Sequence, residues 1–310
     1  MHIESVAISV VVMTFNEEVN LDQCLKTVTG WAREIFVVDS FSNDRTEEIA
    51  RRYTRQFVQH QYENHPAQWD WALKHLPFTT EWVFALDADF RVTEELKQAL
   101  SATVPTLRET TAGIYVRHRQ LFRGRFIRNG TMYPRYWLRL FRPGSVFIDK
   151  SDLVDLHFYV NGKTTNIEHD IIEDNLKERN LSFWITKQVR FAERAAVEEV
   201  GRRRSGEAAP VRPSLLGTPD QRTLWLKSRW YYLPLYWRSV AYFLYRYFIR
   251  LGFLDGREGF LYHLTQALLY RIMVDARIEE LRNSETASVG LRVNVEPGRS
   301  NAATNTNQYL

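Results

Sequence analysis

Strand-like and helix-like segments alternate strictly through the first hundred residues of the chain. Short runs rich in Val and Ile end in polar turn residues, and each is followed by a segment with helical spacing. Runs that are apolar throughout suit strands buried on both faces, so the alternation predicts a doubly wound, mainly parallel sheet flanked by helices. The predicted strand and helix pairs are 7–13 with 19–28, 35–38 with 46–53, 56–58 with 67–76, and 82–86 with 93–100.

The composition is that of a globular protein in a reducing compartment. Of the 310 residues, 45% are hydrophobic and 25% are charged, which excludes disordered and collagen-like classes. The single cysteine, Cys24, can form neither an intrachain disulfide nor a thiolate zinc site, so we expect a buried core residue and a cytoplasmic protein. The apolar stretch 6–15 is too short to span a bilayer and lacks the basic start and cleavage site of a signal peptide.

Polar clusters follow three of the predicted strands. They are residues 14–18 (TFNEE), 39–44 (DSFSND) and 87–89 (DAD). Ligands bind outside the carboxyl ends of the strands in an open parallel sheet, so all three clusters are expected at the same edge. A lone D-x-D is expected about once by chance in a chain of this length, but three clusters at strand ends together predict a ligand site.

The cluster after the first strand contains no glycine. This excludes a Rossmann fingerprint and a Walker loop, so a phosphate group must be bound in another way. Asp87 and Asp89 can hold Mg²⁺ or Mn²⁺, whose charge neutralises a diphosphate. The alternative for either aspartate is a helix cap in front of the helix that begins near Thr93.

A family resemblance rests on three strings: SVVVMTFNEEVNLDQCLKTV, IFVVDSFSNDRTEEIA and WVFALDADFRVTEEL. It continues through YPRYWLRLFR and ITKQVRFAERAA and covers roughly residues 5–280. These strings resemble family 2 inverting glycosyltransferases with the GT-A fold, and most of all the branch that adds sugars to lipopolysaccharide core or related envelope glycans. The resemblance implies an α/β fold with a mixed sheet, a UDP-linked nucleotide-sugar donor and a divalent metal.

The resemblance also assigns the polar clusters. It implies a nucleoside pocket in which Asp39 accepts the base N–H, although Asp39 could instead cap the turn at 42–46. Asp87 and Asp89 would form the metal and diphosphate motif. The pocket lining that it implies is Thr14, Asn16, Glu17, Asp39 and Ser40.

The pattern departs from the family at Trp69 and Asp70. Related sequences tend to have a basic residue and an Asn at these positions, so a contact to the donor phosphates is missing. Trp69 is either a stacking surface for a sugar or base, or a core residue.

An inverting transfer requires a general base for the acceptor hydroxyl. Related sequences often carry V-H-E in the region 149–157, which places Asp155 on the Glu. Asp155 is therefore the predicted base, and Asp152 is the second choice. The His of that motif is absent here, and His169 is predicted to supply its metal or phosphate contact, with a surface or packing role as the alternative.

We expect five consecutive parts. Residues 1–112 form the nucleotide-sugar half and 113–200 the acceptor and catalytic-base half, followed by a linker at 201–223, amphipathic helices at 224–282 and a disordered tail at 283–310. Eight arginines lie between Arg117 and Arg142. Arginine suits bidentate phosphate binding, so Arg139 is predicted to hold a phosphate group; the alternative is a solvated surface.

The segment 224–278 is aromatic and basic. Fourteen of the 42 Phe, Trp and Tyr residues lie between Trp225 and Tyr262, and residues 201–282 carry 14 Lys and Arg against 7 Asp and Glu. Arg238, Arg246 and Arg250 are too costly for a transmembrane hairpin, so two amphipathic helices on an anionic membrane surface are predicted, with a break at 252–259. The alternatives are helices packed on the catalytic core, or a single-stranded nucleic-acid surface, which nothing else in the chain supports.

Together these observations predict a cytoplasmic, metal-dependent glycosyltransferase, peripheral on the inner face of the membrane. It would move a hexose from a nucleotide sugar to a lipid-linked or lipopolysaccharide-core-type acceptor. Two alternatives are a nucleotidyltransferase, disfavoured because such enzymes generally open with a Gly-rich loop, and a catalytically silent membrane-associated scaffold that keeps the nucleotide pocket.

Overall fold

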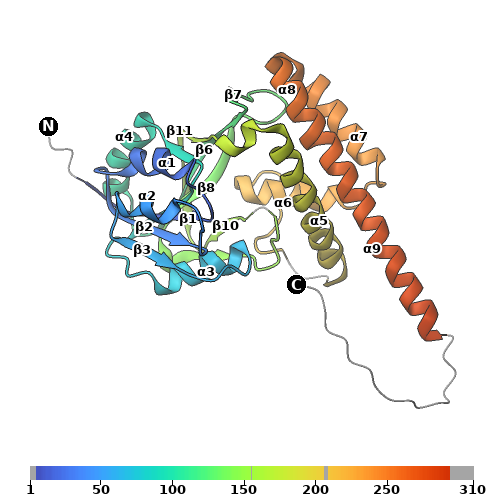
Figure 1. The fold of residues 1–310 in the computed structure, drawn as a ribbon, viewed down its shortest axis with the longest axis horizontal. Coiled ribbons are helices and arrows are strands. Elements are labelled where there is room, and N and C mark those ends of the chain that lie inside the picture. The colour runs from blue at the N-terminus through green and yellow to red at the C-terminus, as the bar shows by residue number, and fades with distance from the viewer. Residues whose placement is uncertain (1–4, 155, 206–208, 294–310) are drawn as a thin grey trace, which may run out of the picture.

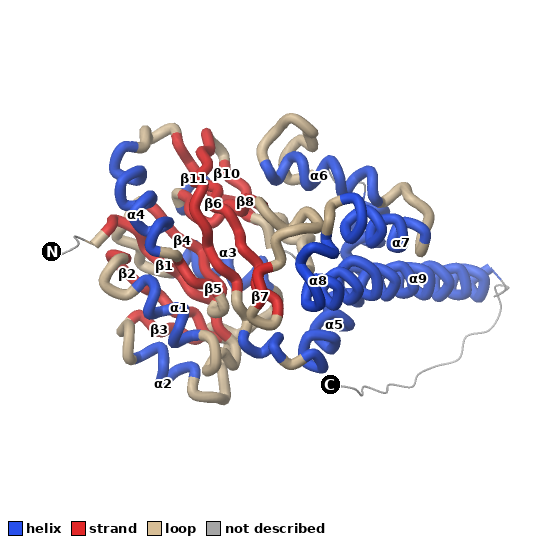
Figure 2. Tube along the Cα trace, turned by 90° about the horizontal axis from the view of Figure 1, so that it is seen from above, coloured by secondary structure: helices blue, strands red, loops and turns tan. Residues whose placement is uncertain are grey.

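A mixed sheet of nine strands forms the centre of the N-terminal half in the computed structural model, which describes residues 5–154, 156–205 and 209–293 (Figures 1 and 2). The strand order is β3-β2-β1-β4-β8-β6-β11-β5, and β7 pairs with β6. The predicted mixed α/β sheet is thereby confirmed. The strands are β1 (Val6–Thr14), β2 (Ala32–Asp39), β3 (Gln56–Gln59), β4 (Trp82–Asp87), β5 (Phe90–Val92), β6 (Thr111–Phe122), β7 (Arg125–Phe126), β8 (Arg135–Phe141) and β11 (Lys163–Glu173); β9 (Val146–Ile148) and β10 (Phe158–Val160) form a separate pair.

Four helices alternate with the first strands as the sequence predicts: α1 (Leu21–Val28), α2 (Thr46–Arg51), α3 (His65–His75) and α4 (Glu94–Thr103). Two begin at side-chain caps, because Asn64 accepts from the backbone N–H of Ala67 and Thr93 accepts from that of Leu96. The strands β1, β2 and β4 are buried on both faces, which explains their uninterrupted apolar runs.

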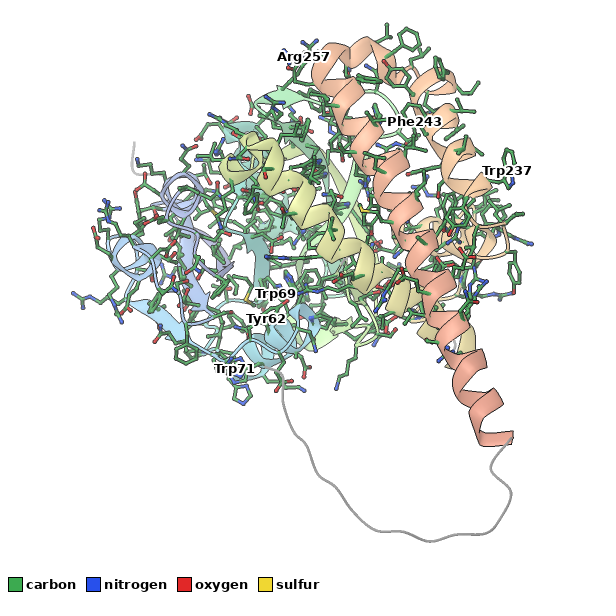
Figure 3. All side chains as sticks on the ribbon, turned by 45° about the vertical axis from the view of Figure 1, so that its right-hand side comes forward. Tyr62, Trp69, Trp71, Trp237, Phe243 and Arg257 are labelled. Carbon is green, nitrogen blue, oxygen red and sulfur yellow. The ribbon has the colours of Figure 1, made fainter. Side chains whose placement is uncertain are left out.

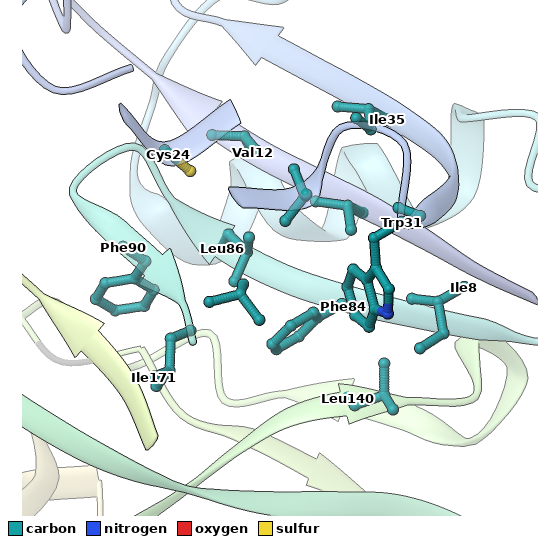
Figure 4. Packing of buried hydrophobic residues seen from close by; sticks show 14 of the residues in the cluster. Ile8, Val12, Cys24, Trp31, Ile35, Phe84, Leu86, Phe90, Leu140 and Ile171 are labelled. Atoms are coloured by element: carbon teal, nitrogen blue, oxygen red, sulfur yellow. The ribbon is translucent and has the colours of Figure 1, made fainter. Parts of the chain in front are cut away.

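The core lies on both faces of this sheet. On one face Ile8, Val12 and Leu86 pack with Trp31 and the buried Cys24 (Figure 4). On the other face the core residues include Val11, Phe36 and Trp69. Burial raises the pKa of the Cys24 thiol, which fits the expected inert core residue.

Among the strands that were not recognised in the sequence are β5 and β11. β5 has three residues, and β11 reads KTTNIEHDIIE, in which polar residues outnumber apolar ones. β11 runs parallel to β6 with register shifts, one of them between Ile167 and Asp170. A bulged strand breaks the period-two pattern by which strands are recognised.

Helices make up the C-terminal half, beside the sheet (Figure 1). The helix α9 packs along α5 through small and apolar side chains that include Ala192, Ala196, Val274 and Ile278. The elements are α5 (Leu181–Ser205), α6 (Pro219–Trp230), α7 (Trp237–Leu244), the π-helix η4 (Tyr245–Ile249), the 3₁₀ helix η5 (Gly252–Asp255), α8 (Gly256–Tyr262), the π-helix η6 (His263–Leu269) and α9 (Tyr270–Val293); short 3₁₀ turns are η1 (Val104–Thr106), η2 (Pro143–Ser145) and η3 (Leu176–Arg179).

Two predicted boundaries are wrong. The linker expected at 201–223 is helical at both ends, because α5 continues to Ser205 and α6 begins at Pro219. Arg202 from the basic triplet is bound by Asp149, Asp152 and Glu198, so the charges stabilise the end of α5. The tail expected to be disordered at 283–310 is helical as far as Val293, and its remainder lies outside the described residues.

Two of the three arginines predicted to face a membrane are placed differently, whereas Arg250 is exposed. Arg238 and Arg246 are 2% and 1% exposed. Arg238 lies between Glu199 of α5 and Asp275 of α9, and Arg246 donates to the carbonyl oxygen of Gly130 at 2.8 Å. These partners are far away in sequence, so the local pattern could not reveal them. Within the described part of the chain, no helix has both the length and the apolarity needed to cross a membrane.

Candidate active site

The three predicted clusters meet at the carboxyl ends of β1, β2 and β4. In the parallel register, Thr14 of β1 lies opposite Asp39 of β2, and Met13 lies opposite Asp87 of β4. Adjacent strands are about 4.8 Å apart, so these side chains share one rim of the sheet. The expectation of a common polar site at this edge is confirmed.

Asp39 is fully buried, and four protein groups bind its carboxylate. Thr14 Oγ1 donates to Oδ1 at 2.9 Å, and the Ser42 backbone N–H donates to Oδ2 at 2.8 Å. The Ser42 hydroxyl and Gln59 Nε2 complete the set. Asp39 therefore holds the turn after β2, as the alternative interpretation stated, and its role toward a nucleoside base stays a prediction.

The loop after β1 is tied to the loop after β2. Asn16 adopts a left-handed conformation with φ 53°, and its side-chain oxygen accepts from the Asn43 backbone N–H at 2.9 Å. Glu17 pairs with Lys177 of η3 at 2.7 Å. Ser40 accepts from Gln68 Nε2 at 3.3 Å, which connects this rim to α3.

Asp87 lies between His65 of α3 and Arg139 of β8. Arg139 Nη2 is 3.4 Å from Asp87 Oδ2, and its guanidinium lies over the rings of Phe90 and Trp137. The structure thus brings the predicted phosphate-binding arginine to the predicted metal motif. Because both rings fix the planar guanidinium, Arg139 is preorganised beside Asp87.

His65 does not neutralise Asp87. Trp69 Nε1 can only donate, and it donates to His65 Nε2 at 3.0 Å, so that nitrogen carries a lone pair. Burial and the nearby Arg139 charge lower the pKa of His65, which keeps the imidazole neutral. Oδ1 of Asp87, 3.7 Å from Nε2, therefore receives no proton from His65 and keeps its capacity to bind a cation or hydroxyl.

Asp89 is held more deeply. Its Oδ2 accepts from Asn175 Nδ2 at 3.0 Å, and its backbone carbonyl accepts from the N–H of Asp174. Burial, followed by the negative charges of Glu173 and Asp87, raises the pKa of Asp89 well above its usual value. An ionised Asp89 is thus costly in the bare protein, and a cation beside it would remove that cost.

A second polar group beside Asp89 was missed in the sequence. His118 Nε2 lies 2.8 Å from Glu173 Oε2, and the His118 ring stacks on Trp137 with centroids 3.7 Å apart. Burial alone would raise the pKa of Glu173, but hydrogen bonds from His118 and Gln120 and the Lys187 charge lower it to about 2. These residues come from β6, β11 and α5, and no short motif connects them.

The site residues fit a divalent metal that is held together with substrate phosphates. No cluster of three or more His, Cys, Asp or Glu able to hold a metal occurs among the described residues. Mg²⁺ is commonly bound by one or two carboxylates plus phosphates rather than by a full protein cage, and Asp87 with Asp89 supplies two carboxylates. The burial and the neighbouring negative charges of Glu173 and Asp87, which raise the pKa of Asp89, point the same way.

His169, the predicted additional metal ligand, is not brought to this site. Its side chain is exposed on β11, next to the register shift between Ile167 and Asp170. Glu173, four residues further along the strand, is the residue of β11 that influences Asp89. The bulge directs His169 to solvent instead.

Of the two predicted bases, Asp152 is the one that lies among the described residues. Asp155 lies outside the described residues. Asp152 is buried and bound by Arg202 Nη2 at 2.6 Å, and its second oxygen lies 3.6 Å from His157 Nδ1. These contacts hold Asp152 against α5 and His157, and its role as a base stays a prediction.

Trp69 is a core residue and not a stacking surface. It is fully buried and meets the Phe158 ring edge to face at 5.1 Å, whereas Trp71 points out of the same helix (Figure 3). Both faces of Trp71 are covered, because it stacks on His60 at 4.1 Å and on His75 at 5.2 Å.

A family model with the description "Glycosyl transferase family 2" matches residues 9–163, half of the chain. The chain belongs to glycosyl transferase family 2. It is accordingly a glycosyltransferase that takes its sugar from a nucleotide-sugar donor. The matched residues hold β1 to β10, and with them Asp39, Asp87, Asp89 and Arg139.

Solved structures of two glycosyltransferases resemble the chain. S. aureus TarS 1-349 in complex with UDP is 14% identical, with 89% of this chain and 91% of that chain covered and a TM-score of 0.41. Glucosyl-3-phosphoglycerate synthase from Mycobacterium tuberculosis in complex with Mg²⁺ and UDP is 17% identical, with 66% and 80% covered and a TM-score of 0.40. Family membership, not these likenesses, assigns glycosyl transfer to the chain.

Proposed function

We propose that this family 2 member is a metal-dependent inverting hexosyltransferase. Its donor is a UDP-linked sugar, and its acceptor is a lipid-linked or lipopolysaccharide-core-type glycan at the inner face of the membrane. The observation that carries the proposal is the placement of Asp87 and Asp89 beside Arg139 at the rim of β1, β2 and β4. Two carboxylates and one fixed guanidinium are suited to a metal-bound diphosphate.

Each part of the rim has a task in this proposal. The loops that contain Thr14, Asn16, Glu17 and Ser40 bind the nucleoside, and Asp39 fixes their geometry through its four hydrogen bonds. Arg139 binds a phosphate oxygen once the donor competes for its contact with Asp87. When bound, the metal stabilises the negative charge of the leaving diphosphate.

The proton of the acceptor hydroxyl needs a base near the sugar. We assign this role to Asp155, on the family pattern at 149–157. Asp152 is not the base in this assignment, because Arg202 already binds it. Instead, Asp152 and Asp149 bind Arg202 of α5 and hold their own segment against that helix.

Protection against thermal unfolding by a panel of nucleotide sugars, with and without Mn²⁺, tests the proposal. A ligand present at 100 times its Kd stabilises a protein by roughly 2.7 kcal/mol, enough for a clear shift. We expect UDP-sugars to protect in the presence of metal. Asp89→Asn should remove the metal dependence and keep the fold, because an amide oxygen can still accept from Asn175.

The matched control is Glu47→Gln, which changes an exposed carboxylate on α2 that pairs with Arg51. It should behave like the wild type. Protection that is equal with and without metal, or equal in Asp89→Asn and the wild type, would contradict the metal assignment. No protection by any nucleotide sugar would contradict the donor assignment.

A further inference from the structure

The helix made of α7 and η4 presents its apolar side chains to the outside. Trp237, Phe248 and Ile249 are 77%, 54% and 71% exposed, whereas Arg238 and Arg246 on the opposite face are buried. Figure 3 shows Trp237 projecting away from the body of the protein. The exposed residues recur every three or four positions and form one face, here called the outer stripe: Trp237, Val240, Leu244, Tyr245, Phe248 and Ile249.

The outer stripe continues beyond its own helix. Leu251, Phe253 and Leu254 in and before η5, and Phe260 of α8, are also exposed large apolar residues. Monomeric soluble proteins rarely expose contiguous apolar surface of this extent without an interaction partner. The buried ion pairs of Arg238 hold the helix in this orientation, so the outward apolar face is fixed by the fold.

Arginines surround one end of this apolar surface. Two lie at the turn from η4 to α8 and three on the hairpin of β6 and β7; this set, here called the arginine rim, is Arg123, Arg125, Arg128, Arg250 and Arg257. All five are exposed, and none takes part in an ion pair within the described part of the chain. The hairpin lies next to α8 (Figures 1 and 2), and a Cβ on Gly256 would be 3.5 Å from the Arg125 guanidinium.

We propose that the outer stripe and the arginine rim dock on the interfacial region of an anionic phospholipid bilayer. Trp and Tyr favour the depth of the headgroups, and arginines next to them match the negative surface of the leaflet. A helix with one apolar face that does not cross the membrane lies in the plane of the interface.

The strand β6 connects this surface to the active site. His118, which is bound to Glu173 beside Asp89, and Arg123 of the rim are five positions apart, roughly 16 Å along an extended strand. A lipid-linked acceptor anchored in the bilayer would thus have its glycan within reach of the site. For this acceptor, the inference rests on the proposed function; the docking itself does not.

Flotation of the full chain with vesicles tests the docking. Vesicles of phosphatidylcholine with phosphatidylglycerol should carry the protein at low salt, and vesicles of phosphatidylcholine alone should carry much less. The stripe variant combines Trp237→Ser, Phe248→Ser and Ile249→Ser and should lose at least about tenfold in binding, because the apolar contribution is gone. The rim variant, Arg250→Gln with Arg257→Gln, should bind weakly at low salt and lose most of the salt dependence.

The exposed face of α5 offers matched controls. Phe183→Ser, Ile185→Ser and Val189→Ser remove three exposed apolar side chains, and Arg190→Gln with Arg194→Gln removes two exposed arginines. Both control proteins should float like the wild type. All variants should keep metal-dependent protection by nucleotide sugars, so that loss of docking and failure of the proposed function are distinguishable.

Three outcomes would overturn the inference. The wild type could fail to float with anionic vesicles at low salt. The stripe variant could float no less than its α5 control. Sedimentation could show a wild-type dimer that the stripe variant dissociates while vesicle binding is absent, which would assign the outer stripe to a second copy.

Discussion

The sheet half and the helical half of this chain use their polar residues in opposite ways. In the sheet, apolar side chains fill both faces, and the charged groups collect at the strand ends, where Asp87 and Asp89 meet Arg139. In the helices, Arg238 and Arg246 are buried, and large apolar side chains of α7 and η4 face outward. Charge gathers at one edge of the sheet in one half and acts as internal structure in the other.

This difference shows that the same residue type carries different information in the two halves. An arginine after a strand end indicates a ligand, because the edge of an open sheet is the binding position of the fold. An arginine at helical spacing among aromatic residues either faces solvent or is buried against an acidic partner inside the protein. Whether such a partner is present decides between the two. Here Glu199 and Asp275, which bind Arg238, also dictate which face of α7 turns outward.

The largest effect is expected where an internal charge is removed. Arg238→Leu takes the guanidinium away from the buried Asp275 and leaves Glu199 paired with Arg203, and breaking a buried pair from one side costs about 3–5 kcal/mol. Urea denaturation would show this loss in the free energy of unfolding. Arg277→Leu breaks the exposed pair with Glu280 and should cost about 0–1 kcal/mol. Equal costs in the two variants would mean that the inward arginine is not structural.

The second prediction concerns the border between the halves, where Asp152 meets Arg202 of α5. Asp155→Asn should lower kcat at least about 100-fold with little change in stability, as expected for loss of a positioned general base. Asp152→Asn should instead reduce stability, because Arg202 loses a partner at 2.6 Å, and should affect kcat less. Steady-state kinetics with thermal denaturation of both proteins measures this. The reverse pattern would make Asp152 the base.

The fold of the sheet half could be predicted from the sequence because its strands and polar clusters lie in short continuous segments. β1, β2 and β4 are short apolar segments, and each is followed directly by its polar cluster, so the shared rim could be predicted from the parallel order alone. The strand β11 was not found because its polar residues and its bulge hide the period of two. Glu173, at the end of this strand, was missed for the same reason.

The remaining parts of the site depend on contacts between distant residues. The pair of His118 and Glu173 and the pair of His65 and Trp69 exist through tertiary packing, and neither has a sequence signature. The helical half shows the same limit, since acids of α5 and α9 determine the burial of Arg238. Composition predicted the aromatic and basic character of 224–278 correctly but could not say which face carries which residues.

The smallest predicted effect comes from a third inward polar side chain of the helices, His263. It is fully buried, and neither ring nitrogen has a hydrogen-bond partner in the described part of the chain. Burial and the charge of Arg246 lower the pKa of His263 to about 3. A lowered pKa in the folded state means that its contribution to stability is present above the unfolded pKa of about 6.5 and is lost as pH falls toward 3.

From these values, the free energy of unfolding should fall by about 2 kcal/mol between pH 7 and pH 5 on account of His263 alone. Burial also lowers the pKa of His65 and of His118, so both residues make stability fall with falling pH. The raised pKa of Asp89 has the opposite effect on stability. His263→Leu isolates the single contribution, because the other groups are present in both proteins. Leucine leaves no polar atom unpaired, so the variant should be at least as stable as the wild type at pH 7, and its advantage should grow by about 2 kcal/mol at pH 5 in urea denaturation. Parallel pH profiles for the two proteins would show that His263 is solvated or paired in the folded state, and that the interior of the helical half, unlike that of the sheet, admits water.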